Sequence, residues 1–453
     1  MRPMLKPALR RGWRDAESVQ FGVDRRHAVV LGPVDGAAAG FLDLLDGTRG
    51  MDALVADAAA LGLGPERVRR LLGELAEGGV LDDASAHAAL SASVRHRSAL
   101  LDRLRPDLAA LSLVHPAPGA GPARIRHRGA SRVRVLGAGR VGAALAAVLS
   151  AAGVGAVDLV DGGRVEPWDT GPCGIPADHA GERRDAAGRG AVRRAAGAAP
   201  VRPPGARPPG THPPGSAVER TRARAARAGA GPGRGGSVTR PGVDADAGAA
   251  PGGEAPGVDV LAVVAPRDGL YAFAPDEEQA RELVGAGVPH LYAGVLEDTG
   301  LVGPLVLPGR TGCGECLGLL LADRDPAWPR LLAQLRSGRR QAVPACDVAL
   351  ATAVAGTAAG HVLAHLDGRL PPSTGARLEL PSAGPAPRVL AVPGHPGCGC
   401  GAAALGGRPP RGRGGREIAD QDERDKASPP RGTDRVLAAA PTAASSQGGT
   451  MAM

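Results

Sequence analysis

The sequence predicts an α/β protein in which a Rossmann-like domain follows a small winged-helix-like α+β domain. Three observations lead to this prediction. Residues 132–161 have the pattern strand, glycine turn, helix, strand and acid, and residues 1–85 contain short strands followed by three short helices. Two closely spaced cysteine pairs lie between residues 313 and 400. A chain of 453 residues has room for two or three domains, so both units fit.

The stretch RVRVLGAGRVGAALAAVLSAAGVGAVDLVD has the pattern of a nucleotide-binding βαβ unit. In its turn, Gly137 permits the tight bend, Gly139 lets the backbone approach a phosphate, and Gly142 lets the helix pack closely on the strand. Asp161 ends the second apolar run, 24 residues after the first glycine. We therefore predict that these four residues bind a nucleotide. A close-packed βα turn without a ligand is the alternative.

The N-terminal residues, 1–85, are expected to form the winged-helix-like module. The expected strands and helices cover residues 19–23, 28–31, 40–45, 51–61 and 65–77. The apolar side chains of the last helix share one face, and they are Val68, Leu71, Leu72 and Leu75. An anonymous helical cap is the alternative for this part of the chain.

A helical connector rich in proline and glycine is expected at 86–130, before a domain that spans 131–401. The further expected elements of that domain are strands beginning at 258 and 288, a β-rich block at 300–308, and helices at 277–287 and 347–368. Residues 402–453 are rich in Gly, Pro, Ser and charged residues, and we expect them to be disordered.

Residues 186–256 consist of Arg, Pro, Gly and Ala with almost no large apolar side chain, so they cannot offset the entropy of ordering. The stretch 181–256 holds 13 arginines and six acids, which accounts for most of the net charge of +8. The rest of the chain is close to neutral, and this argues against a nucleic-acid partner. Two interpretations stay open: a disordered insertion, or an ordered βα unit replaced through compensating frameshifts.

The sequence predicts a cytoplasmic protein without a membrane partner. The start, MRPMLKPALRR, is basic but leads into no apolar signal core. The most apolar stretch, 348–366, is Ala-rich and contains two histidines, which is typical of a buried helix. Six cysteines in 453 residues are too few for a disulfide scaffold.

Four of the cysteines have the spacing of a metal site. Cys313-x-x-Cys316 follows the β-rich block, and Cys398-x-Cys400 lies beyond the last expected strand. Two such pairs can supply four thiolates in a tetrahedron, as in a structural Zn²⁺ site. Zinc would tie the end of the chain back onto its domain. Free or redox-active thiols and a disulfide are the alternatives, and His395 lies close enough in sequence to replace one thiolate.

Together these motifs resemble the ThiF family, adenylyltransferases related to the activating enzymes of ubiquitin-like proteins. The resemblance covers about 131–175 and 257–401, and its motifs are the glycine loop, GVGAVDLVD, VDVLAVVAPRD, GVPHL, G-x-V-G-P-L-V-L-P-G-x-T-x-C-x-x-C and the closing cysteine pair. Members of the family bind ATP and magnesium at the glycine loop and adenylate a C-terminal carboxylate. The resemblance implies that Asp161 holds the ribose and that Asp268 is the magnesium-binding or catalytic aspartate.

The chain departs from the family pattern in three places. Gly163 stands where the family has a second acid, and DTGPCG at 169–174 replaces an Asn-x-x-Arg segment. No lysine lies between positions 6 and 426, so the family's phosphate-contacting lysine has no counterpart. Arg183 and Arg184 stand nearby and are candidates for that contact, although arginine is not an interchangeable point charge. Each lost contact removes about 3 kcal/mol of electrostatic stabilisation from phosphoryl transfer.

The N-terminal module is similar to a PqqD-type recognition element, which binds precursor leader peptides in peptide natural-product pathways. This similarity rests on element order and on the LLDGTR turn at 44–49. The fusion of both parts resembles the ThiF-like proteins of azole-forming clusters, whose partner is a YcaO-type cyclodehydratase.

The resemblance implies two functions. The one we favour is a scaffold with a degenerate ATP site that captures a leader peptide and presents it to the cyclodehydratase. The other is an active ATP-dependent adenylyltransferase. A nicotinamide oxidoreductase fits less well, because a zinc-tied end and the absence of a substrate-pocket motif do not suit it. The sequence leaves the oligomeric state open, and a homodimer is one of the states it allows.

Overall fold

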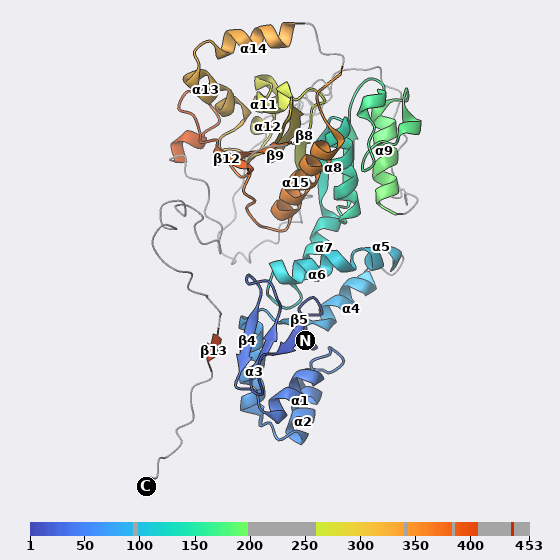
Figure 1. Ribbon diagram of the computed structural model, residues 1–453, viewed down its shortest axis with the longest axis vertical. Coiled ribbons are helices and arrows are strands. Elements are labelled where there is room, and N and C mark those ends of the chain that lie inside the picture. The colour runs from blue at the N-terminus through green and yellow to red at the C-terminus, as the bar shows by residue number, and fades with distance from the viewer. Residues whose placement is uncertain (94–97, 198–259, 339–342, 383–385, 406–435, 439–453) are drawn as a thin grey trace, which may run out of the picture. The chain divides into compact units, whose positions relative to one another are not determined.

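The computed structural model describes residues 1–93, 98–197, 260–338, 343–382, 386–405 and 436–438 (Figure 1). The chain divides into two compact units, Met1–Arg126 with Arg416–Met453, and His127–Gly415, and each is described by itself. The domain boundaries inferred from the sequence, at 85, 130 and 401, stay predictions.

The first unit begins with short strands and three helices around one core. Their bounds are β1 Pro3–Leu5, β2 Arg11–Trp13, β3 Val19–Phe21, β4 Val29–Gly32, α1 Gly36–Leu44, α2 Met51–Ala60, α3 Pro65–Glu77 and β5 Leu81–Asp83. Strands β2, β3 and β4 form an antiparallel sheet, β1 pairs with β5, and β13 (Val436–Ala438) pairs in parallel with the outer edge of β4.

Simple periodicities explain these elements. In β3, Val19 and Phe21 are buried on the inner face, as expected for alternating side chains in a strand. Helix α3 starts with Pro65 at its first turn, where the missing N–H costs nothing. The four apolar residues predicted to share one face of α3 are all buried. The strands and helices therefore lie close to where the sequence predicts them, while the winged-helix assignment itself stays a prediction.

Further helices complete this unit: α4 Ala84–Ser93, α5 Ser98–Arg103, α6 Arg105–Val114 and α7 Ala120–Ala130, whose last residues enter the second unit. Lys6 ties the strands to these helices, since its Nζ donates to the carbonyls of Ser112 (2.6 Å) and Pro116 (2.9 Å). The side chain is almost fully buried, and burial lowers the pKa of Lys6.

The second unit is built on a seven-stranded sheet of order β12-β11-β10-β9-β8-β6-β7. Its strands are β6 Arg132–Leu136, β7 Ala156–Val160, β8 Val260–Val264, β9 His290–Leu296, β10 Thr299–Val306, β11 Ala376–Pro381 and β12 Arg388–Ala391. Its helices are α8 Arg140–Ala151, α9 Arg184–Ala195, α11 Leu270–Phe273, α12 Glu277–Gly285, α13 Gly314–Arg324, α14 Trp328–Ser337, α15 Val348–Leu366 and the short η2 Pro167–Asp169, η3 Ala177–His179 and η4 Ala402–Leu405.

Strands β7, β6, β8 and β9 run parallel, and β9 to β12 continue antiparallel. Strand β6 pairs with β7 on one side and β8 on the other, so the chain reverses its direction across the sheet at β6. In open α/β sheets, ligands bind at the carboxyl ends of the strands at such a switch point. The glycine loop follows β6 there.

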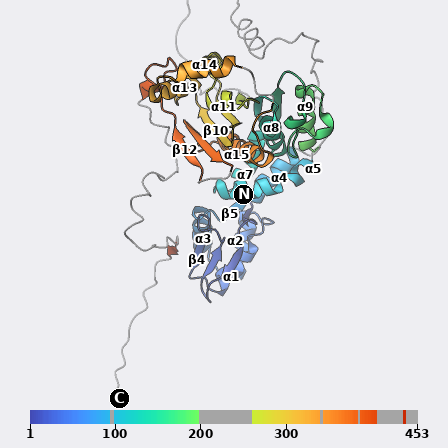
Figure 2. The same ribbon diagram turned by 45° about the horizontal axis from the view of Figure 1, so that its top comes forward.

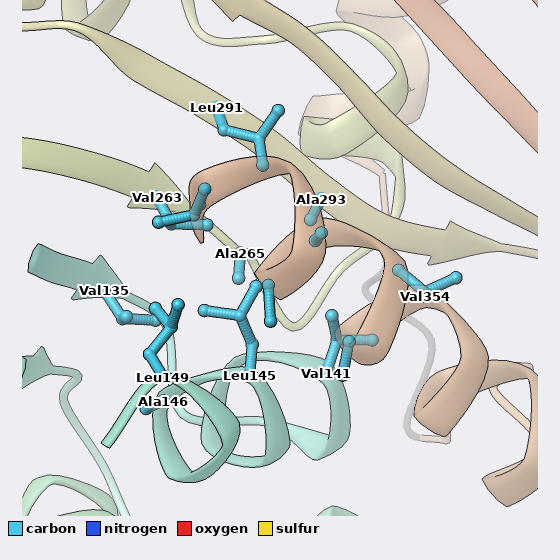
Figure 3. Close-up of a cluster of buried hydrophobic side chains, with 14 of the residues drawn as sticks. Val135, Val141, Leu145, Ala146, Leu149, Val263, Ala265, Leu291, Ala293 and Val354 are labelled. Atoms are coloured by element: carbon cyan, nitrogen blue, oxygen red, sulfur yellow. The ribbon is translucent and has the colours of Figure 1, made fainter. Parts of the chain in front are cut away.

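Side chains of the sheet point alternately to two cores. On one face, Val135, Val263 and Leu291 meet Leu145 of α8 and Val354 of α15 (Figure 3). Figures 1 and 2 both show α8 and α15 side by side, and the two helices are in contact. The other face buries Val264, Tyr292 and Val306 against three cysteines. Val263 therefore lies in one core and its neighbour Val264 in the other, because successive side chains of a strand point to opposite faces of the sheet.

Among the described residues, α15 is the one helix with the length and apolar composition of a membrane span. Asp347 caps its N-terminus by accepting from the Ala349 N–H at 2.8 Å. One face, which includes Leu350, Val354 and Val362, is buried in the core with the sheet and α8. These contacts agree with the prediction of a core helix.

The ordered part of the chain continues further than its composition predicts. We expected order to be lost from residue 186, but α9 continues to Ala195. Ala187, Gly188 and Ala191 are buried, and a Cβ on Gly188 would lie 2.6 Å from Leu159 of β7. Small residues thus let α9 pack closely on its neighbours, which a count of large apolar side chains overlooks. The remainder of the segment, 198–256, lies outside the described residues, as does nearly all of the C-terminal tail.

A buried ion pair closes the end of α15. Arg128 and Asp367 form two hydrogen bonds, Nε to Oδ1 at 2.9 Å and Nη2 to Oδ2 at 2.6 Å, with side chains 6% and 5% exposed. We expect Asp367→Ala to lower the free energy of unfolding by about 3–5 kcal/mol, because it strands a buried guanidinium. Chemical denaturation measures this.

The matched control is Asp158→Ala, since the pair of Asp158 with Arg132 is 3.8 Å long and nearly half exposed. Its loss should cost less than about 1 kcal/mol. If the two substitutions lowered the free energy of unfolding equally, burial would not explain the contribution of the Asp367 pair to stability.

Candidate functional site

The glycine loop is held against the neighbouring strand by close backbone contacts. Gly137 has φ +118°, and a Cβ there would lie 1.9 Å from the Ala265 carbonyl oxygen. A Cβ on Gly142 would lie 2.1 Å from the Gly137 carbonyl oxygen. Gly139 caps helix α8, whose N-terminus presents free N–H groups and a positive dipole end. The loop therefore has the geometry of an anion-binding turn, and no side chain fits at Gly137 or Gly142.

Asp161 lies directly beside this loop. Its Oδ2 accepts from the Ala138 N–H at 2.6 Å, and its Oδ1 accepts from Arg184 Nη1 at 3.2 Å. Both carboxylate oxygens thus already have donors within the protein. Asp161 and Arg184 are each 13% exposed.

The Arg184 guanidinium packs against Gly163 on its way to Asp161. A Cβ on Gly163 would lie 3.3 Å from Arg184 Nη2, and its φ of +79° is one that other residues rarely adopt. Arg184 also donates to the carbonyls of Arg164 (2.7 Å) and Gly162 (3.0 Å). The missing second acid thus makes room for the guanidinium.

A second carboxylate extends this arrangement. Asp169, 2% exposed, lies 3.2 Å from Arg184 Nε and accepts from Arg267 Nε at 2.5 Å. The row Asp161–Arg184–Asp169–Arg267, called the ion-pair chain below, has both of its ends at the glycine loop, since Asp161 accepts from the Ala138 N–H and Arg267 lies against Gly139. The Arg267 stem covers Gly139, where a Cβ would lie 3.4 Å from its Cγ.

A small cavity remains beside the loop, with a volume of about 20 Å³. It is lined by residues 139–142, Trp168, Asp169, 265–267, Val295, Pro344 and Cys346. Two buried donors, Arg267 Nη2 and Trp168 Nε1, have no hydrogen-bond partner among the described residues. Arg140, which also lines the cavity, donates to the carbonyls of Thr170 (3.1 Å) and Cys346 (2.8 Å). The cavity holds little more than one water-sized group, but its free donors suit an acceptor oxygen.

The other predicted catalytic residues lie outside this cavity. Arg183 is two-thirds exposed and pairs with Asp185 at 3.1 Å. Asp268 is exposed at the end of β8, and its carboxylate accepts from the Leu270 N–H at 3.0 Å. The roles of Asp268, Arg183 and Arg184 in catalysis stay predictions.

Cys346 also borders a wider, open cavity of about 660 Å³. Glu297, Asp298, Asp347 and Ser382 line it, and the first two follow the carboxyl end of β9. Burial raises the pKa of the Cys346 thiol, which therefore stays protonated near neutral pH. Cys346 lines both cavities, and the wider one offers space for a second ligand.

The four predicted metal ligands lie together. Their sulfurs are all within 4.8 Å of one another, with Cys313–Cys316 at 3.8 Å, Cys313–Cys398 at 3.6 Å and Cys316–Cys400 at 3.5 Å. In a tetrahedral site with Zn–S bonds of about 2.3 Å, neighbouring sulfurs lie about 3.8 Å apart. The cluster therefore fits a four-coordinate metal, and zinc is the ion we expect.

His395 supports this cluster without joining it. Its ring nitrogens contact Asp323 Oδ2 (2.9 Å) and the Gly397 N–H (3.0 Å), and its backbone N–H donates to Cys316 Sγ at 3.4 Å. A hydrogen bond from the Cys313 thiol, followed by smaller contributions, lowers the pKa of Cys316. Sulfur atoms that accept hydrogen bonds are typical of thiolate ligands.

Sequence reasoning missed Asp169, Arg267, Arg140 and Trp168. Arg267 immediately precedes Asp268. Asp169 lies in the segment 169–174, which departs from the family pattern. For the charged residues among them, charge was the only available signal, because Asp169 and Arg267 are 98 positions apart in the sequence and nothing in it indicates that they pair.

Comparisons with known proteins identify the family of one part of this chain. Residues 116–203 match the ThiF family, so the chain contains a ThiF family domain. That stretch includes the glycine loop, Asp161 and Arg184. No curated protein matches the sequence.

Solved structures share the fold over most of the chain. A crystal structure of E. coli MccB with MccA has a TM-score of 0.58 and 14% identity, covering 88% of this chain and 99% of that one. E. coli MccB with ATP has a TM-score of 0.57 and 14% identity, covering 88% and 99%. The heterocyclase TruD has a TM-score of 0.52 and 16% identity, covering 89% of this chain and 43% of that one. At these identities the likeness establishes a ThiF-type fold.

Purified protein is expected to contain about one Zn²⁺ per chain, and Cys398→Ser should release it and lower the unfolding midpoint, because three thiolates no longer close the site. Elemental analysis and thermal denaturation measure both effects. Cys173→Ser, at an exposed cysteine outside the cluster, is the control and should keep the metal. A metal-free wild-type protein of unchanged stability would contradict the assignment.

Proposed function

We propose that this protein binds the leader peptide of a ribosomally made precursor and presents it to a YcaO-type cyclodehydratase, and that its ATP site is degenerate. The observation that carries the second part is the ion-pair chain. In a nucleotide site the ribose acid is available to the ligand, whereas here Arg184 lies on Asp161 and Arg267 covers Gly139. When the charged side chains of a family site pair with one another in this way, they are not available to ATP, so the site is ill suited to adenylation.

The peptide-binding part is supported by the first unit. The sheet there has the order β13-β4-β3-β2, so the outer side of β4 pairs with the extended segment 436–438 of the same chain. An edge that accepts one strand offers main-chain N–H and C=O groups to another. The solved MccB structures add support, since a biosynthetic enzyme of the same fold is solved in complex with N-formylated MccA. We place the leader peptide on the β4 edge, in exchange for β13.

An active adenylyltransferase is the second candidate, favoured by the wide cavity that shares Cys346 with the small cavity at the glycine loop. A cavity of about 660 Å³ next to a nucleotide would hold the end of a peptide whose carboxylate is activated. Zinc serves a structural role in both functions, whereas ATP and magnesium are needed only in the second.

ATP–pyrophosphate exchange separates the two functions. With candidate precursor peptides, we expect no exchange above a protein-free control, because the family's lysine is absent and Asp161 is engaged by Arg184. Exchange that depends on both peptide and protein, and that Asp268→Asn abolishes, would favour the adenylyltransferase instead.

Leader binding is tested by proline substitution at the two edges of the sheet. Val30→Pro should weaken binding of a fluorescein-labelled leader peptide at least tenfold, because it disrupts the main chain of β4. Gly12→Pro lies on the opposite edge strand, β2, where a Cβ meets no atom within 4 Å, and should bind as wild type. Fluorescence anisotropy gives both affinities, and circular dichroism checks folding. The reverse pattern would move the peptide to the β2 edge.

A further inference from the structure

We propose that strand β13 is an internal competitor, which occupies the outer edge of β4 until a precursor peptide displaces it. The inference rests on the proposed leader binding at that edge and adds the regulation of that site. The ligand class is an extended peptide segment, and the competitor is the chain's own segment 436–438.

Strand β13 uses the outer side of β4 over nearly its whole length. The two strands run parallel, and residues 436–438 lie opposite residues 30–32. The inner side of β4 pairs antiparallel with β3. Since each side of a strand pairs with one neighbour at a time, a peptide cannot pair with residues 30–32 while β13 is in place.

The outer edge of β4 has no second place for a peptide. Before the strand, the N–H groups of His27 and Ala28 both donate to the Asp24 carbonyl, at 2.9 and 2.8 Å, so they belong to a turn. After the strand, Pro33 has no N–H to donate. The usable edge is therefore limited to Val29–Gly32, and β13 pairs with three of its four residues.

Strand β4 is held in place independently of β13. Val29 and Leu31 are 5% and 3% exposed, and they belong to a core whose buried residues lie between Val19 and Leu81. Strand β3 is bonded along the inner side of β4. Departure of β13 therefore frees main-chain groups at the edge without opening the described core.

The strength of the β13 pairing suits a competitor that can be displaced. A parallel pair of three residues is short, and parallel pairing is slightly less stable per residue than antiparallel pairing. Because β13 belongs to the same chain, it acts at an effective concentration of about 1 mM where its linker permits the contact. It therefore excludes weakly binding peptides, whereas a longer or antiparallel strand can replace it.

Hydrogen exchange of the full chain tests whether β13 covers the edge. The triple-proline variant carries Val436→Pro, Leu437→Pro and Ala438→Pro, which together remove every N–H of β13. The control carries Ala443→Pro, Ala444→Pro and Ser445→Pro, outside the paired segment. Amides of β4 that face away from β3 should exchange at least tenfold faster in the triple-proline variant than in the wild-type protein or the control, as measured by mass spectrometry. Equal exchange in all three proteins would overturn the proposal.

Fluorescence anisotropy with fluorescein-labelled candidate precursor peptides tests the competition. The triple-proline variant should bind a peptide at least threefold more tightly than the wild-type protein and the control do. Equal affinities would overturn the proposal even if exchange is faster in the variant, because β13 would then cover the edge without competing.

Failure of the proposed function gives a different result. If none of the three proteins binds any candidate peptide, the proposed leader binding fails and the competition fails with it, while hydrogen exchange still reports whether β13 covers β4. If circular dichroism shows that the prolines disturb folding, a chain that ends at Thr433 gives the same comparison, since it also lacks β13.

Discussion

The close approach of two backbone segments, Gly137 and Ala265, organises the second unit. The Ala265 N–H donates to the Leu136 carbonyl at 2.8 Å, and the Gly137 N–H donates to the Val160 carbonyl at 2.9 Å. The glycine loop is thereby bonded to both neighbouring strands at once. Because the chain leaves β8 at this point, the next residues pass directly over the loop, which puts Arg267 against Gly139. The position of the cation at the loop therefore depends on a backbone contact that only glycine permits.

The sequence predicted the elements that depend on local pattern. The glycine loop, the strand that ends in Asp161 and the buried helix α15 are encoded within short windows by spacing and by apolar period. The cysteine pairs could also be recognised, since ligand spacing within each pair limits where the sulfurs can lie. Most of helix α9 was not predicted, because its packing surface consists of alanine and glycine. The contribution of such small residues to stability depends on how closely a neighbouring element packs against them.

The identity of the cations at the site could not be predicted in the same way. Arg183 and Arg184 are indistinguishable by sequence, yet one is exposed and the other is held between two carboxylates. What separates them is the absence of a side chain at Gly163 and the presence of Asp169 in a turn of 3₁₀ helix. Such pairings form between elements that only the folded sheet brings together. A buried carboxylate needs a partner, and where the family's ligand contacts are missing, internal arginines supply it.

The scarcity of lysine gives this protein a built-in reporter of local opening. Besides the α-amino group at Met1, the chain has two primary amines, Lys6 and Lys426. Lys6 is 1% exposed, with its nitrogen bonded to two carbonyl oxygens from the α6–α7 region. An acylating reagent therefore reaches that nitrogen only when β1 separates from those helices. The rate at which Lys6 is acylated, followed at that residue by peptide mapping, reports the opening free energy of the first unit, and the two other amines are few enough to be resolved from it.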